Sequence, residues 1–245
     1  MSGEQLKDKV AIVTGGASGI GLGIARLFTR ERSRVALVDL SEERGAAAAK
    51  AIADKGGEVI FIRADVTSSA QVAQGVKEIV QRLGPPDILV NNAAIRIIGK
   101  VTDITEGEWD RVIDTDLKGL FLFSKECIPL MAARGGGVIV NISSGSAYGR
   151  PERAAYCAAK AGVIGLTRAM SLDHRNERIR VNCVVPAFTL SGMTEDSPPE
   201  VLAAQAKKSV AGRVATPEDV AAAALFLCSD AAVTITGAVL EMSSP

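Results

Sequence analysis

The sequence predicts a doubly wound α/β (Rossmann) fold, in which helices cover both faces of a parallel seven-stranded sheet. Seven short apolar runs rich in β-branched residues recur along the 245 residues. Each run is continuous rather than alternating, as expected for strands that are buried on both faces. Helical stretches separate the runs, and this alternation of strand and helix favours a parallel sheet. No linker or repeat divides the chain, so residues 1–245 are expected to form a single domain.

The same pattern places the individual elements. After Gly19, the residues Ile20, Ile24 and Phe28 recur on one face of a helix. A second helix, rich in alanine, is expected from Ala154 to about Asp173. The predicted strands are, in order, Val10–Val13, Val35–Val38, Val59–Ile62, Ile88–Val90, Val138–Ile142, Ile179–Val185 and Ala238–Met242.

Composition excludes several classes of protein. The 28 basic and 28 acidic side chains leave no net charge, whereas a nucleic-acid binder usually needs a basic face. Residues 1–9 show no secretory signal, and no apolar run approaches the roughly 20 residues that span a bilayer. Four scattered cysteines and one histidine argue against a metal site or a disulfide framework. We therefore expect a cytoplasmic protein with no metal and no nucleic-acid or membrane partner.

A glycine-rich loop directly follows the first predicted strand. Its sequence, residues 14–21, is TGGASGIG. Glycines at 15, 19 and 21 allow a sharp turn and a close approach of the backbone to a diphosphate. The next helix directs its free N–H groups and the positive end of its dipole toward the same place. Tight strand-to-helix turns also use glycine, so the loop alone is weak evidence for a dinucleotide site.

An acidic residue at the end of the second strand strengthens that interpretation. Asp39 stands where a carboxylate hydrogen-bonds the ribose hydroxyls of a bound adenosine. Its charge would repel a 2′-phosphate, and neither the glycine loop nor the position directly after Asp39 holds Lys or Arg. The sequence therefore favours NAD over NADP, although Arg44 lies one helical turn further on. A role for Asp39 as a helix N-cap is the alternative.

A tyrosine and a lysine four residues apart form a candidate acid–base pair. Tyr156 and Lys160 lie in the alanine-rich helical segment, where this spacing puts both side chains on one helix face. A cation beside a phenol favours the phenolate, which can exchange a proton with an alcohol near neutral pH. Ser143 and Ser144 end the fifth strand at its carboxyl end, where ligands bind in open α/β sheets.

In this order and at these positions, the motifs make the chain resemble the short-chain dehydrogenase/reductase family over essentially its whole length. The resemblance implies hydride transfer between a nicotinamide cofactor and a secondary alcohol or ketone. The matching segments are TGGASGIG (14–21), Asp39, Asp65-Val66, NNAA (91–94), NISS (141–144), YCAAK (156–160) and RVNCVVPA (180–187).

The resemblance also implies a role for each matching residue. Tyr156 would exchange the proton with the substrate oxygen, Lys160 would bind the nicotinamide ribose, and Ser144 would hydrogen-bond the reacting oxygen. The implied cofactor-binding residues are Gly15, Ser18, Gly19, Ile20, Gly21, Asp39, Asp65, Val66, Asn92, Tyr156, Lys160 and Thr189.

Among the departures from the family pattern, the one at position 116 bears most directly on catalysis. The family usually has an asparagine where this chain has Asp116, and that asparagine is thought to hold a water that links the lysine to solvent. An ionised carboxylate accepts hydrogen bonds but cannot donate them, and it favours the ammonium form of Lys160. We predict that Asp116 keeps a catalytic role in this relay, with an altered pH dependence.

The substrate pocket is expected to have walls from residues 95–100, 145–153 and 188–210. The last segment is polar around residues 191–199 and is predicted to act as a substrate lid, with a plain surface loop as the alternative. Arg150 and Arg153 could reach an anionic substrate or a neighbouring subunit. The family resemblance further implies a homodimer or homotetramer.

Three functions are compatible with the sequence. The first is an NAD-dependent alcohol dehydrogenase or carbonyl reductase acting on a small-molecule secondary alcohol or ketone. The second is an NADP-dependent 3-oxoacyl-carrier reductase, against which Asp39 argues. The third is a catalytically impaired nucleotide-binding subunit, against which Ser144, Tyr156 and Lys160 argue. The identity of the substrate does not follow from these motifs.

Overall fold

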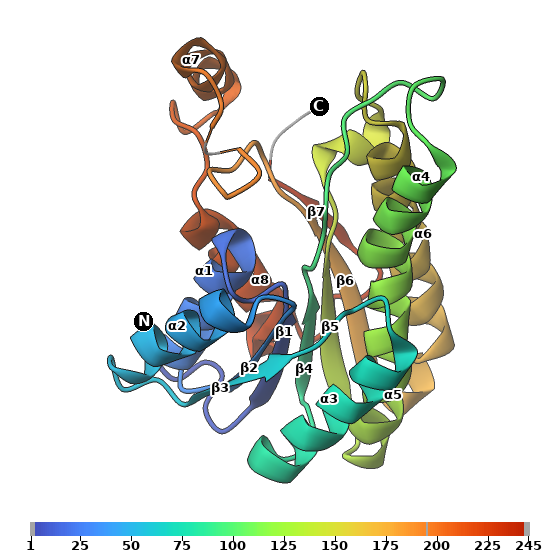
Figure 1. Cartoon of the computed structure of the whole chain (residues 1–245). Helices are drawn as coiled ribbons and strands as arrows, with labels where there is room; N and C mark the ends of the chain where they lie inside the picture. Colours follow the sequence, from blue (N-terminus) through green and yellow to red (C-terminus); the bar gives the residue numbers. More distant parts are fainter. Residues whose placement is uncertain (1–2, 195, 243–245) are drawn as a thin grey trace.

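Seven parallel strands form one sheet at the centre of the chain in a computed structural model, which describes residues 3–194 and 196–242 (Figure 1). The strands follow the order β3-β2-β1-β4-β5-β6-β7, and each neighbouring pair is parallel. Each predicted strand overlaps an observed one, which confirms the predicted doubly wound sheet. Their bounds are β1 Val10–Thr14, β2 Arg34–Asp39, β3 Val59–Arg63, β4 Ile88–Asn91, β5 Gly137–Ile142, β6 Ile179–Val185 and β7 Val239–Glu241.

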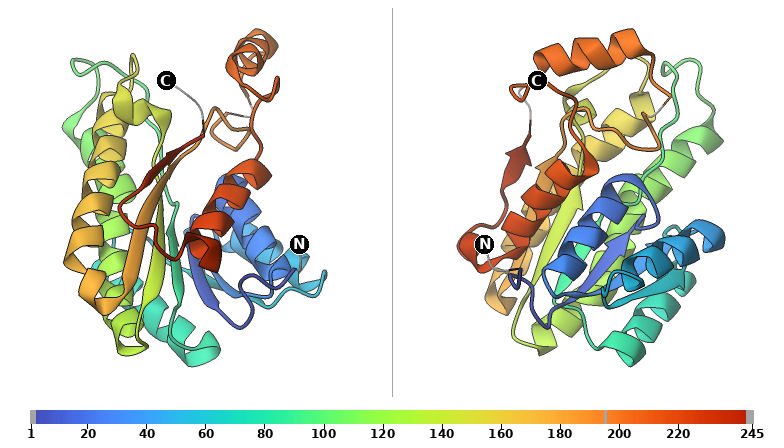
Figure 2. Two further views of the ribbon diagram at one scale, coloured as in Figure 1. Left: turned by 180° about the vertical axis from the view of Figure 1, so that it is seen from behind. Right: turned by 90° about the vertical axis from the view of Figure 1, so that its left-hand side faces the viewer.

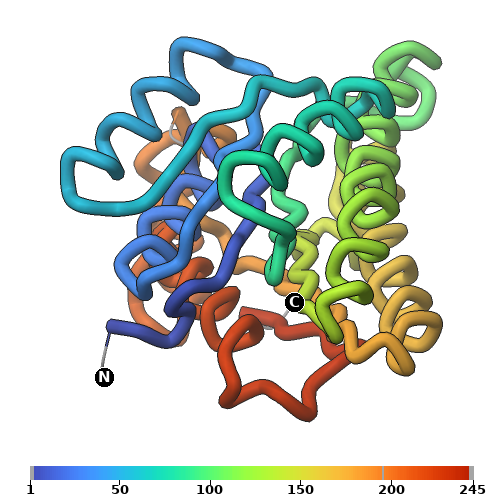
Figure 3. The backbone as a smooth tube through the Cα atoms, turned by 90° about the horizontal axis from the view of Figure 1, so that it is seen from below, coloured from blue at the N-terminus to red at the C-terminus, as the bar shows by residue number. Residues whose placement is uncertain are grey.

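Two layers of helices cover the sheet, as the view from below shows (Figure 3). On one face lie α1 (Gly19–Arg30), α2 (Glu42–Ala53) and α8 (Pro217–Cys228). On the other lie α3 (Ser69–Leu83), α5 (Gly119–Ala133) and α6 (Ala154–Asp173). The short helix α4 (Glu106–Ile113) runs into α5 through a π-helical turn, Asp114–Lys118. Among the described residues, no helix is long and apolar enough to cross a membrane.

Burial on both faces of the sheet explains why the strand sequences are apolar without alternation. In β1, Val10 and Ile12 pack into the core beside α3, α5 and α6. The intervening Ala11 and Val13 pack into the second core, beside α1 and α8. Successive side chains of a strand point to opposite faces, so each strand supplies both cores. The predicted apolar face of α1 is buried too, with Phe28 fully enclosed.

The sheet has a switch point between β1 and β4. Strand β1 pairs with β2 on one side and with β4 on the other, so the chain winds outward in opposite directions from these two strands. The loops that follow them therefore diverge and leave a crevice at the carboxyl ends of the strands, which is where open α/β sheets bind ligands. The glycine loop after β1 and the NNAA segment after β4 meet at this crevice.

Helix α7 (Pro199–Lys208) stands apart from the sheet, beyond the carboxyl ends of the strands (Figure 2). None of its side chains is fully buried. It lies within residues 188–210, the segment predicted to act as a lid. The start of that segment is tied to the body of the domain, because Thr189 forms a β-bridge with Ala215. A segment attached at its base and little buried beyond it can open without unfolding the sheet.

The packing of Gly21 generates the first prediction. A Cβ at this position would overlap the carbonyl oxygen of Gly15 and would lie 2.6 Å from Nδ2 of Asn92. Since the first of these neighbours is backbone, Gly21→Ala is expected to lower the free energy of unfolding by about 1–3 kcal/mol, as overpacking typically does. Urea-induced unfolding measures this loss.

Gly107→Ala is the matched control for that experiment. Gly107 lies in the first turn of α4, and no atom stands within 4 Å of the position that its Cβ would take. Alanine also has the higher helix propensity, so this variant should unfold at the same or a slightly higher urea concentration. Equal stabilities for the two variants would show that the Gly15–Gly21 contact does not constrain the loop.

Candidate active site

A cleft of about 720 Å³ lies at the carboxyl ends of the strands, across the switch point. It extends from the ends of β2 and β3, past the glycine loop, to the end of β5 and the start of α6. Four residues that the sequence did not single out, Asp110, Arg111, Asp114 and Thr115, also line it, and so do residues 191–193 of the predicted lid. The predicted residues that line the cleft are Gly15, Ser18, Gly19, Ile20, Asp39, Asp65, Val66, Asn92, Tyr156 and Lys160.

The glycine loop is held in place by the segment that follows β4. Gly15 has a φ of +63° and Gly19 a φ of +52°, a left-handed conformation that favours glycine. Asn92 donates from Nδ2 to the carbonyl oxygens of Thr14 (3.0 Å) and Gly15 (3.1 Å). The Thr14 hydroxyl in turn accepts from the backbone N–H groups of Asn92 and Ala93. The Asn92 side chain therefore braces the loop within the structure itself.

Asp39 joins the glycine loop to the start of α2. Its Oδ2 accepts from the backbone N–H of Ala17 (3.2 Å), and its Oδ1 accepts from that of Ser41 (3.1 Å). The residue that caps α2 is Ser41, whose hydroxyl accepts from the backbone N–H of Arg44. The alternative interpretation of Asp39 as the N-cap is therefore wrong. The carboxylate is half-buried and lines the cleft together with Arg44.

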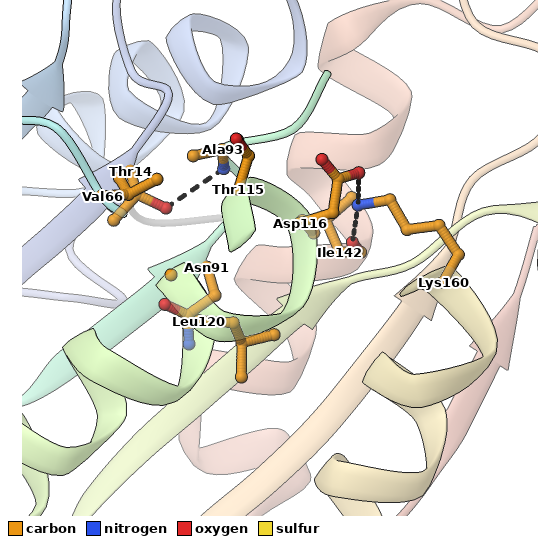
Figure 4. Close-up of a pocket in the computed structure, with 10 residues that line it drawn as sticks. Thr14, Val66, Asn91, Ala93, Thr115, Asp116, Leu120, Ile142 and Lys160 are labelled. Atoms are coloured by element: carbon orange, nitrogen blue, oxygen red, sulfur yellow. Dashed lines mark hydrogen bonds and ion pairs between the residues drawn. The ribbon is translucent and has the colours of Figure 1, made fainter. Parts of the chain in front are cut away.

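A buried ion pair connects Lys160 with Asp116 (Figure 4). Lys160 Nζ lies 3.3 Å from Asp116 Oδ2 and donates to the carbonyl oxygen of Ile142 at 3.1 Å. The second carboxylate oxygen, Oδ1, accepts from the backbone N–H of Ile95 at 2.8 Å. The side chains of Lys160 and Asp116 are 3% and 0% exposed. The sequence thus predicted correctly that a carboxylate would stand beside this lysine.

Burial and pairing act against one another in this ion pair. Burial by itself would lower the pKa of Lys160, but the neighbouring Asp116 and Tyr156 outweigh it and raise that pKa. Burial also raises the pKa of Asp116, against the opposing effects of the Lys160 ammonium and the Ile95 N–H. Lys160 therefore keeps its proton to a higher pH than an exposed lysine does, and it does so because Asp116 is present.

The π-helical turn Asp114–Lys118 places Asp116 against Lys160. A π turn is a wide helical turn that is frequently found at functional sites, and within this turn the Asp116 side chain is buried. A cavity of about 10 Å³, the room that one water molecule needs, borders Asp116, Lys160 and Asn91. Asn91 Oδ1 is buried and has no hydrogen-bond donor among residues 3–194 and 196–242.

Tyr156 lies one helical turn before Lys160 on α6. The Lys160 ammonium stands 5.6 Å from the centre of the tyrosine ring. The ring is mostly buried among Val112, Ala155 and Ala159, with isoleucines of the segment after β4 packed against them. Ser143 fixes this part of α6 to the sheet, because its hydroxyl donates to the Lys160 carbonyl oxygen at 2.8 Å.

Four predicted residues do not line the cleft: Asp116, which borders the small cavity instead, and Ser144, Thr189 and Gly21. Ser144 is half-buried, and its Oγ accepts from the backbone N–H of Ser146 at 3.1 Å, which caps a short 3₁₀ turn. Thr189 is buried and donates to the carbonyl oxygen of Ala187. Gly21 packs against the backbone of Gly15 in the glycine loop. The substrate role of Ser144 and the cofactor roles of Gly21 and Thr189 stay predictions.

The start of the predicted lid covers the glycine loop. Ser191, Gly192 and Met193 line the cleft, and a Cβ at Gly19 would lie 3.2 Å from the Cβ of Ser191. The Arg96 guanidinium donates to the Met193 carbonyl oxygen. The sequence missed Arg96, although it lies in the 95–100 segment expected to form a pocket wall. Its signal in the sequence was its place two residues after the NNAA motif.

A dinucleotide-type cleft that ends at a tyrosine–lysine pair defines an oxidoreductase of the Rossmann class. The chain belongs to the short-chain dehydrogenase/reductase family, whose members use nicotinamide cofactors. Residues 15–244 match the family model described as enoyl-(acyl carrier protein) reductase. The family resemblance inferred from the sequence is confirmed.

Individual relatives match over nearly the whole chain. 2-(S)-hydroxypropyl-CoM dehydrogenase 3 of Xanthobacter autotrophicus is 40% identical, over 96% of this chain and 94% of the relative. The 3-oxoacyl-[acyl-carrier-protein] reductase FabG of Chlamydia muridarum is also 40% identical, over 97% and 96%. The crystal structure of gox2181 superposes with a TM-score of 0.93 at 34% identity, covering 98% of this chain and 96% of that one.

The ion pair generates a prediction about pH. Asp116→Asn removes the carboxylate that raises the pKa of Lys160, while the burial that lowers it stays. The ammonium is then lost at a lower pH, so the basic limb of the pH–rate profile should move to lower pH. Asp173→Asn is the matched control, because Asp173 is an exposed acid at the far end of α6. A profile that is the same in wild type and Asp116→Asn would contradict the coupling.

Proposed function

We propose that this oxidoreductase is an NAD-dependent dehydrogenase or reductase that interconverts a secondary alcohol and its ketone. The observation that carries the proposal is the placement of two functional groups along one cleft. The Asp39 carboxylate lies where β2 ends, and the Tyr156–Lys160 pair lies where β5 ends and α6 begins. A dinucleotide that spans the switch point would have its adenosine at the first position and its nicotinamide at the second.

The residues of the cleft fit such a cofactor. Gly15 and Gly19 carry no Cβ and have left-handed backbones, so the chain can approach a diphosphate closely. Helix α1 begins at Gly19, and the free N–H groups of its first turn favour a bound anion. Within residues 3–194 and 196–242, the carboxylate of Asp39 accepts two backbone hydrogen bonds, which leaves acceptor positions for ribose hydroxyls.

The chemistry at the other end of the cleft falls to Tyr156 and Lys160. When bound, the nicotinamide ring accepts or returns the hydride. In the oxidation direction, the Tyr156 phenolate takes the proton of the alcohol hydroxyl while the alcohol carbon gives up its hydride. The products are a ketone and a Tyr156 that carries its proton again. Reduction runs the same steps backward. The Lys160 ammonium stabilises the negative charge on the phenolate throughout.

A 3-oxoacyl-carrier reductase is the second candidate. The description of the matching family model and the FabG relative support it. Arg44 lines the cleft beside Asp39, and a guanidinium there could pair with the 2′-phosphate of NADP. We favour NAD because the Asp39 carboxylate stands in the same part of the cleft, where it opposes a second negative charge.

Tyr156→Phe tests the acid–base role. Loss of the hydroxyl is expected to reduce kcat by at least about 100-fold, the usual range for a general acid–base group, while NADH still binds. Nicotinamide absorbance over a panel of secondary alcohols and ketones measures turnover, and NADH fluorescence measures binding. Tyr148→Phe is the matched control: the segment 145–153 was expected to form a pocket wall, but none of its residues lines the cleft, and the Tyr148 hydroxyl donates to Glu241 instead. Retained turnover in Tyr156→Phe would refute the assignment.

Asp39→Asn tests the choice of cofactor. The amide keeps the shape of the side chain but removes the charge that opposes a 2′-phosphate. The ratio of kcat/KM for NAD to that for NADP should therefore fall by about tenfold or more, as expected for a unit charge at close range in a partly buried site. Glu42→Gln, which removes a charge from the exposed first turn of α2, should leave the ratio unchanged. A wild-type preference for NADP would favour the acyl-carrier alternative.

A further inference from the structure

Three arginines lie in the segments that flank the Tyr156 end of the cleft, just outside its lining residues. Arg96 follows β4, whereas Arg150 and Arg153 lie in the connection from β5 to α6. The backbone joins the two segments: Gly99 forms a β-bridge with Arg153, and its N–H donates to the Glu152 carbonyl oxygen at 2.8 Å. Residues far apart in the sequence are therefore held together at the start of the helix that carries Tyr156.

The positive charge of this cluster is not compensated by the protein. No carboxylate lies within 4.0 Å of any of the three guanidinium groups in the described part of the chain. Partial burial, together with the charges of Arg96 and Arg150, lowers the pKa of Arg153. The N-terminus of α6, directly after Arg153, adds the positive end of a helix dipole. Unpaired like charges oppose one another unless an anion joins them.

The cluster stands next to the reacting groups. Arg153 precedes Tyr156 by three residues, which is about one helical turn. Arg96 lies between Ile95 and Ile97, both of which pack against the apolar cluster around the Tyr156 ring. Its guanidinium also bonds to Met193, a residue that lines the cleft. The glycine loop that would hold the cofactor diphosphate is a separate part of the cleft, so the arginines are free for the second reactant.

We propose that the substrate carries an oxyanion, a carboxylate or a sulfonate, which Arg96, Arg150 and Arg153 bind while its alcohol or ketone carbon faces Tyr156. The inference rests on the proposed alcohol–ketone function and specifies its substrate class. Arginine suits this task because its planar fork makes paired hydrogen bonds with a carboxylate or sulfonate. Ile95, which lines the cleft, would contact the carbon chain between the two ends.

Matched substrates test the proposal. Keto acids of increasing chain length, beginning with 4-oxopentanoate, are each compared with their methyl ester and with the sulfonate analogue. For the wild type, kcat/KM should be at least about tenfold higher for the acid than for its ester, as expected for a charge-assisted hydrogen bond. The sulfonate arm shows which oxyanion is preferred. Equal kcat/KM for acids, sulfonates and esters would overturn the proposal.

Arginine variants locate the effect. Arg96→Gln, Arg150→Gln and Arg153→Gln should each reduce kcat/KM for the acid by about tenfold, mainly through KM, and leave the ester unchanged. Arg82→Gln is the control, since Arg82 is exposed on α3 and pairs with Glu78. If Arg153→Gln weakens the fold, Arg150→Gln still tests the anion site, because Arg150 is exposed and its replacement should not destabilise the protein. Equal losses for acid and ester would also overturn the proposal.

A binding measurement separates this inference from the proposed function. Titration calorimetry of 4-oxopentanoate into the NADH complex of Tyr156→Phe needs no turnover. If no alcohol or ketone is turned over but the acid binds in an arginine-dependent way, the proposed function fails and the anion site stands. If esters are turned over and the acid binds equally well without the arginines, the function stands and the anion site is overturned.

Discussion

The buried ion pair between Lys160 and Asp116 is the contact on which the candidate active site depends. It joins helix α6, the π-helical turn before α5, the end of β5 through the Ile142 carbonyl, and the segment after β4 through the Ile95 N–H. A buried charge without its partner is destabilising by several kcal/mol, so each side chain holds the other in place. Because Tyr156 lies one turn from Lys160 on the same helix, the geometry of the acid–base pair follows from this contact.

Much of the fold follows from the sequence, because the sheet is buried on both faces. Runs such as residues 10–13 and 35–38 must be apolar throughout to fill two cores, and a strand with one face in water would alternate instead. The cleft residues at the ends of strands, such as Asp39 at the end of β2, could also be placed from the sequence. The carboxyl ends of parallel strands all lie at the same edge of the sheet. Their positions follow from topology and need no knowledge of side-chain packing.

The remaining features depend on contacts that sequence periodicity does not record. The π-helical turn adds one residue to a helical turn, and what holds it there are the contacts of Asp116 with Ile95 and Lys160 across the domain. Two other contacts also depend on the folded backbone: the hydrogen bond that the Ser144 hydroxyl accepts from the Ser146 N–H, and the β-bridge between Gly99 and Arg153. A motif specifies that a residue type is present, whereas its direction is set by neighbours from elsewhere in the chain. Arg96 became significant only once the structure placed its guanidinium against the Met193 carbonyl.

The aspartate at position 116 changes what the ion pair can do as well as where it lies. If one proton moves from Lys160 to Asp116, both groups become neutral, and the net buried charge is zero before and after the transfer. An asparagine has no second protonation state, so it could only orient a water or the ammonium. Burial favours the neutral pair and mutual attraction favours the charged one, which is why the pKa of Asp116 and that of Lys160 are both raised. The lysine therefore has beside it a second titratable group, which an asparagine at this position would not supply, and one small cavity borders both side chains.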